Sequence, residues 1–135
     1  MPGKVRLGNI NDSNDLRILL NSLEIVKRKG KELWNPIDVI NTIYNENAGF
    51  IIGKDDDCLT FYVKTEYSIN ICWIWTAYSK GTNVLEYYID DIKELATKCN
   101  CSEIRWSSKR KGYAKRIPKV DGQIHQIEYK IQIGN

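Results

Sequence analysis

The sequence has little histidine, little proline and no long apolar run. Its single histidine, His125, and four cysteines do not have the paired spacing of a Cys/His metal site. No stretch approaches the roughly 18 consecutive apolar residues that a membrane-spanning helix needs. The N-terminus, Met1–Val5, lacks the apolar core of a secretory signal. We therefore expect no metal, no membrane contact, and a protein of the cytoplasm or of a particle that assembles there.

Two common catalytic motifs are also missing from the 135 residues. There is no Gly-x-x-x-x-Gly-Lys-Ser/Thr loop for a nucleotide and no Gly-x-Ser-x-Gly nucleophile elbow. Asp55–Asp57 lacks the alternating ligands of a calcium loop, and we interpret it as a charged turn. We interpret the four cysteines, Cys58, Cys72, Cys99 and Cys101, as buried free thiols.

The net charge of +3 is small, but the positive charges are clustered. One dense group consists of Lys109, Arg110, Lys111, Lys115, Arg116 and Lys119. This basic patch, with Trp106 and Tyr113 stacking on bases, would suit a nucleic acid. The other interpretation is that these positive charges belong to a helix and only face water.

The apolar periodicity predicts one α/β domain over residues 1–135. Alternating or apolar runs predict strands at 4–7, 49–53, 59–64, 69–78, 102–106 and 127–133. Helical spacing predicts helices at 12–30, 36–44, 84–99 and 108–117. The order is β-α-α-β-β-β-α-β-α-β. Since the strand 69–78 is apolar on both faces, we expect it to be central and parallel to the strand 102–106.

The central stretch, Ile69 to Trp106, resembles the GNAT superfamily of acyl-coenzyme A-dependent N-acyltransferases. It contains a buried strand, the loop Ser-Lys-Gly-Thr-Asn, a long amphipathic helix and the strand Ser-Glu-Ile-Arg-Trp. The resemblance implies an α+β, GNAT-like fold with a central mixed sheet and helices on both faces. Ala77–Gly81 and Arg110–Tyr113 also resemble small, degenerate phage-encoded members.

In the superfamily, the loop before this helix has the cofactor-binding signature Gln/Arg-x-x-Gly-x-Gly/Ala. Glycines there let the backbone approach the pyrophosphate of coenzyme A. Gly81 keeps one signature position, whereas Tyr78 and Asn83 depart from the other two. The resemblance implies that the loop would bind the cofactor, if it binds, through Tyr78, Ser79, Lys80, Gly81, Thr82 and Asn83.

The superfamily commonly uses a carboxylate near the central strands as base and a tyrosine in the following helix as acid. The strand 69–78 contains no carboxylate. The candidates are Glu66 and Glu103 at strand ends and Tyr113 in the basic segment.

These departures favour a non-catalytic protein with no cofactor, such as a phage virion or assembly component. Its partners would be other proteins, or copies of itself in an oligomer or particle. Trp34, in the polar link between two helices, is the candidate interface anchor. The alternative is an N-acetyltransferase that uses acetyl-coenzyme A and an amine acceptor. A weaker alternative is nucleic-acid binding through residues 109–119.

Overall fold

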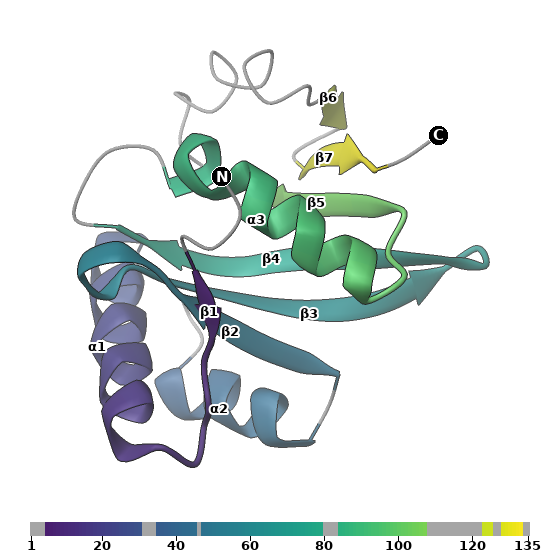
Figure 1. The fold of residues 1–135 in the computed structure, drawn as a ribbon. Coiled ribbons are helices and arrows are strands. Elements are labelled where there is room, and N and C mark those ends of the chain that lie inside the picture. Colours follow the sequence, from purple (N-terminus) through teal and green to yellow (C-terminus); the bar gives the residue numbers. More distant parts are fainter. Residues whose placement is uncertain are drawn as a thin grey trace.

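The computed structural model describes residues 5–30, 35–45, 47–79, 84–107, 123–125 and 128–133. Their elements are β1 (Arg6–Leu7), α1 (Ser13–Gly30), α2 (Pro36–Asn45), β2 (Ala48–Ile52), the 3-10 turn η1 (Lys54–Asp56), β3 (Cys58–Glu66), β4 (Ile69–Tyr78), α3 (Val84–Lys98), β5 (Glu103–Ser107), β6 (Gln123–His125) and β7 (Glu128–Gln132). The strands form one sheet, ordered β1-β2-β3-β4-β5-β7-β6, with helices on both faces (Figure 1). The predicted α+β class with a central mixed sheet is confirmed.

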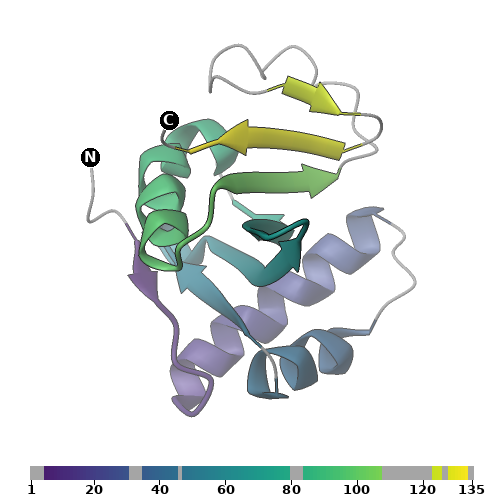
Figure 2. The same ribbon diagram turned by 90° about the vertical axis from the view of Figure 1, so that its right-hand side faces the viewer.

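The sheet consists of two antiparallel parts joined by one parallel pair. Strands β1 to β4 pair antiparallel in chain order. Helix α3 then crosses over, and β5 pairs parallel with β4, as predicted. Strands β5, β7 and β6 form the second antiparallel part, beyond β4 (Figure 2). The sequence predicted one final strand at 127–133, but the end of the described chain contributes two, because β6 folds back on β7.

The first two helices begin where the sequence predicts. The carboxylate of Asp12 accepts hydrogen bonds from the backbone N–H groups of Asn14 and Asp15, at 2.8 and 3.3 Å, and so caps α1. At α2, the backbone N–H of Asn35 donates to the carboxylate of Asp38 at 2.9 Å. Pro36 occupies the first position of α2, where no backbone N–H is needed.

The core has two parts because successive side chains of a strand point to opposite faces of the sheet. On one face, Phe50 and Ile52 of β2 pack with apolar residues of α1 and α2, among them Leu23. On the other face, Ile51 packs with residues of α3, among them Ile92. No helix in the described ranges is both long and apolar enough to cross a bilayer.

The four cysteines are free thiols. Cys58 lies in the core beside α1, and Cys72 and Cys101 lie in the core beside α3. Cys99 is only partly buried. The interpretation of the cysteines as packing residues is confirmed for the three that are buried.

Candidate active site at the end of β4

Strands β4 and β5 share only a short ladder. Their register runs from the pair Ile71–Glu103 to the pair Trp73–Arg105. Beyond Trp73, β4 continues to Tyr78 on the side of β3, while the last residues of β5 pair with β7. Among the described residues, the two central strands thus have no common register at the end where β4 leads to α3. An edge of β4 is left there beside β5.

A β-bulge in β4 accompanies this separation. The register of β3 with β4 shifts between Thr60 and Phe61, which leaves Trp75 as an extra residue. Trp75 packs against the core beside α1 and α2 and meets Tyr62 of β3 edge to face, with 5.7 Å between the ring centroids. The indole is therefore held toward β3. An indole between β4 and β5 would instead block an extended ligand.

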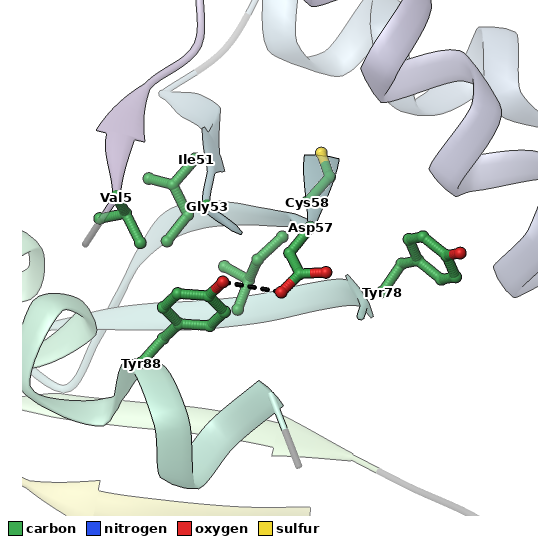
Figure 3. A pocket seen from close by; sticks show the side chains of 8 residues that line it. Val5, Ile51, Gly53, Asp57, Cys58, Tyr78 and Tyr88 are labelled. Atoms are coloured by element: carbon green, nitrogen blue, oxygen red, sulfur yellow. Dashed lines mark hydrogen bonds between the residues drawn. The ribbon is translucent and has the colours of Figure 1, made fainter. Parts of the chain in front are cut away.

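A buried carboxylate lies beside the end of β4. Asp57, just before β3, has 7% of its surface exposed. One of its oxygens, Oδ2, accepts a hydrogen bond from the hydroxyl of Tyr88 in α3 at 2.7 Å (Figure 3). The same oxygen accepts a hydrogen bond from the hydroxyl of Ser79, directly after β4, at 3.0 Å. Three elements therefore meet at one atom.

The hydroxyl of Tyr88 is fixed in its role as a donor to Asp57. It accepts a hydrogen bond from the backbone N–H of Lys54 at 2.9 Å, so its own proton is directed to the carboxylate. Burial, and then the hydrogen bond to Asp57, raise the pKa of Tyr88 well above its ordinary value. The hydroxyl consequently stays protonated at neutral pH. A pocket of about 10 Å³, at the limit for one water molecule, adjoins the pair.

The sequence did not reveal this cluster. Asp55 and Asp56 lie in an exposed turn with positive φ, as a charged turn predicts, but Asp57 at the end of the same run is buried. Tyr88 falls in the predicted buried stripe of α3, but its hydroxyl finds a carboxylate 31 residues away. The one local signal is the position of Asp57 immediately before an alternating strand.

The two candidate bases, Glu66 and Glu103, both form ion pairs with Arg105. Glu103 is buried and accepts hydrogen bonds from the guanidinium of Arg105 at 2.8 Å and from the amide of Gln132 at 2.9 Å. Arg105 also donates to Glu66 at 3.1 Å. The hydrogen bond from Arg105, and a second from Lys64, lower the pKa of Glu66. A lowered pKa makes a carboxylate a weaker general base near neutral pH.

This network also lies far from the end of β4. Glu103 pairs with Ile71, and Tyr78 lies seven positions farther along β4, or about 23 Å at roughly 3.3 Å per residue. The geometry therefore supports a structural role for Glu66 and Glu103, joining β3, β5 and β7 across the sheet.

Several predicted site residues lie outside the described ranges. Of the predicted cofactor loop, only Tyr78 and Ser79 are described. Lys80–Asn83, the interface candidate Trp34, and residues 108–122 with Tyr113 and the basic patch are not. Their roles stay predictions.

No protein-family profile and no curated protein sequence matches the chain. Solved structures do match it. The NatC complex bound to Gag peptide and CoA aligns with a TM-score of 0.70 at 8% identity, over 99% of this chain and 100% of the matched one. Aminoglycoside acetyltransferase meta-AAC0020, from an uncultured soil metagenomic sample, aligns at 0.67 and 12% identity, over 91% and 90%. Ribosomal-protein-alanine N-acetyltransferase from Brucella melitensis biovar Abortus 2308 aligns at 0.63 and 10% identity, over 90% and 93%.

The chain has the GNAT acetyltransferase fold. The sequence-based preference for a non-catalytic phage virion or assembly component is wrong. Matched structures that share this fold over about nine-tenths of the chain include a probable acetyltransferase, an aminoglycoside acetyltransferase and a ribosomal-protein-alanine N-acetyltransferase, and none of these is described as a virion component. Tyr78 and Asn83 are two positions of one loop, whereas the likeness in fold to these proteins extends over about nine-tenths of the chain.

Proposed function

We propose that the chain is an N-acetyltransferase that uses acetyl-coenzyme A and an amine acceptor. The observation that carries the proposal is the separation of β4 from β5 after the pair Trp73–Arg105. The superfamily that the sequence resembles holds the pantetheine arm of coenzyme A in such a gap. The likeness in fold to named acetyltransferases supports the same proposal.

The described residues fit coenzyme A. The pantetheine arm is extended and contains amide groups, and the edge of β4 from Ile74 to Tyr78 presents backbone N–H and C=O groups on the side of β5. The free N–H groups at the start of α3 suit the pyrophosphate. Trp75 leaves this edge accessible because its ring packs toward β3. Acetyl-coenzyme A would supply an activated acetyl thioester, and the chain would supply binding and orientation.

The acceptor amine has to lose a proton before its nitrogen can attack. Glu66 and Glu103 are engaged by Arg105, so neither is assigned as the base. Tyr113 is kept as the proposed acid because it follows β5 in the sequence, about one helical turn earlier than the tyrosine of the superfamily pattern. The cofactor would therefore bind at the end of β4. The ion-pair network of Arg105, Glu66 and Glu103 would take no part in proton transfer.

The first test is a titration of the pure protein with acetyl-coenzyme A, followed by calorimetry and by thermal unfolding. A ligand at 100 times its dissociation constant stabilises the folded state by about 2.7 kcal/mol. Gly81→Val is the matched variant, since a β-branched side chain obstructs the close approach of backbone to phosphate. Binding by the wild type and its loss in Gly81→Val support the proposal. Absence of any response of the wild type at millimolar ligand contradicts it.

The second test is turnover. Release of free coenzyme A thiol is followed with a panel of amines that includes aminoglycosides, polyamines and peptide N-termini. Acetylation of at least one amine, at a rate above that of hydrolysis, is the expected result.

A further inference from the structure

One carboxylate oxygen accepts hydrogen bonds from residues on both sides of the predicted cofactor loop. Ser79 is the residue directly before Lys80–Asn83, and Tyr88 lies in the second turn of the helix directly after it. Both donate to Oδ2 of Asp57. We propose that this group of three, the Asp57 clamp (Asp57, Ser79 and Tyr88), positions the loop for coenzyme A and sets the affinity for the cofactor. The inference rests on the proposed function.

The hydrogen bonds of the clamp are of the strong kind. A carboxylate without donors is costly to bury, whereas donors to an ionised oxygen form shorter and stronger hydrogen bonds than neutral pairs. Asp57 is almost fully buried, and the distance from the hydroxyl of Tyr88 is 2.7 Å. The clamp therefore connects β3, the end of β4 and α3 more firmly than exposed contacts would.

Gly53 is a second, independent sign that the packing is built around this hydroxyl. A Cβ atom at Gly53 would lie 2.5 Å from the hydroxyl oxygen of Tyr88. The φ of Gly53 is −114°, which any residue adopts, so glycine is not needed for the backbone conformation. It is needed for the space that the hydroxyl occupies beside the backbone N–H of Lys54.

A loop that is held before the ligand arrives binds it more tightly. Backbone N–H groups attract phosphate only when they point to one place, and ordering a loose loop costs part of the binding energy. The clamp involves residues on the two flanks of the loop, and none of the three is assigned a part in proton transfer. Its loss should therefore weaken the binding of cofactor and leave the chemical step alone.

The test compares Tyr88→Phe and Ser79→Ala with Ser22→Ala. Ser22 is the control for the loss of one buried hydroxyl, which donates to the backbone carbonyl of Leu19 within α1 at 2.8 Å and also contacts the thiol of Cys58, the residue after Asp57. We expect each clamp variant to raise the Kd for coenzyme A and the KM for acetyl-coenzyme A about tenfold, the scale of one charge-assisted hydrogen bond. For Tyr88→Phe, which lies outside the predicted cofactor loop, we expect kcat to stay within about twofold. Ser22→Ala leaves the hydroxyls of Ser79 and Tyr88 in place, so it should leave Kd and KM unchanged.

Asp57 itself gives a rescue experiment. Asp57→Asn keeps an oxygen that accepts hydrogen bonds, so it should bind coenzyme A better than Asp57→Ala does. Thermal unfolding checks that each variant folds, and the partly exposed Ser79 keeps the test available if changes at Tyr88 or Asp57 prevent folding.

The outcomes separate the two proposals. If the wild type binds coenzyme A and both clamp variants bind it equally well, the clamp is wrong and the proposed function stands. A control variant that loses affinity as much as the clamp variants also contradicts the clamp, because the effect is then one of stability. If the wild type does not bind coenzyme A, the proposed function itself is wrong.

Discussion

The carboxylate of Asp15 is buried in the first turn of α1, and its replacement by asparagine should destabilise the protein in a pH-dependent way. Asp15 accepts two hydrogen bonds from the guanidinium of Arg6, at 2.9 and 2.6 Å, and one from the backbone N–H of Asn9 at 3.0 Å. The hydrogen bonds from Arg6, and then from Asn9, lower the pKa of Asp15 from 3.8 to about 2. The contacts join β1, the following turn and α1.

The pKa gives an upper limit to the effect. A lowering from 3.8 to about 2, at 1.36 kcal/mol per pH unit, corresponds to at most about 2.4 kcal/mol of stability. The side chain of Arg6 is 55% exposed, so solvent screens part of the attraction. We therefore expect Asp15→Asn to lower the free energy of unfolding by about 1–2 kcal/mol at neutral pH.

The sign of the pH dependence follows from the direction of the pKa. The unfolded chain takes up the proton of Asp15 more readily than the folded chain, so acid favours unfolding. The stabilisation is complete above about pH 4 and is lost as the pH falls toward about 2.

Urea unfolding of the wild type and Asp15→Asn, at a series of pH values from neutral to about 2.5, measures this difference. Asp38→Asn is the matched control, because Asp38 also lies in the first turn of a helix and accepts a backbone hydrogen bond, but is exposed. It should cost less than about 1 kcal/mol. A difference between wild type and Asp15→Asn that stays constant or grows on acidification would refute the reasoning.

Three further predictions concern packing, backbone conformation and thiol chemistry. Leu23→Ala, at a fully buried position of α1, should lower the free energy of unfolding in urea by about 2.7–5 kcal/mol. A loss below about 1 kcal/mol would contradict the packing of α1 on the sheet. Asn100 ends the turn after α3 with φ of 59°, so Asn100→Val should lower stability by about 1–2 kcal/mol and Asn100→Gly should not, as thermal unfolding can check. Burial raises the pKa of three thiols, to about 11 for Cys58, about 12 for Cys72 and about 11 for Cys101. A thiol reagent should therefore modify them much more slowly in the folded protein than in urea. Equal rates in the two conditions would refute their burial.

Local features of the fold could be predicted because their signals are local. The predicted starts of α1 and α2 coincide with hydrogen bonds of Asp12 and Asp38 to residues two or three positions away. The two apolar faces of β4 predicted a central strand, and the helix between β4 and β5 predicted their parallel pairing.

The candidate site could be predicted only in outline, since it depends on contacts between distant residues. The bulge at Trp75 arises from the register between β3 and β4, which no single segment encodes. The burial of Asp57 depends on donors from the end of β4 and from α3, so the run of three aspartates resembles an ordinary turn in the sequence. The hairpin of β6 and β7 was missed in part because β6 is only three residues long.

The single parallel ladder between the two antiparallel parts of the sheet also bears on how the chain folds. Strands β2, β3 and β4 pair with their neighbours in sequence, and such local contacts form early at a small entropic cost. The pairing of β5 with β4 has to wait until the segment with α3 has closed a long loop, and it contributes only three residue pairs. Attachment of β5 and β7 is therefore expected to be a late step in folding. The same junction should exchange its amide hydrogens by local opening before the β2–β4 meander does.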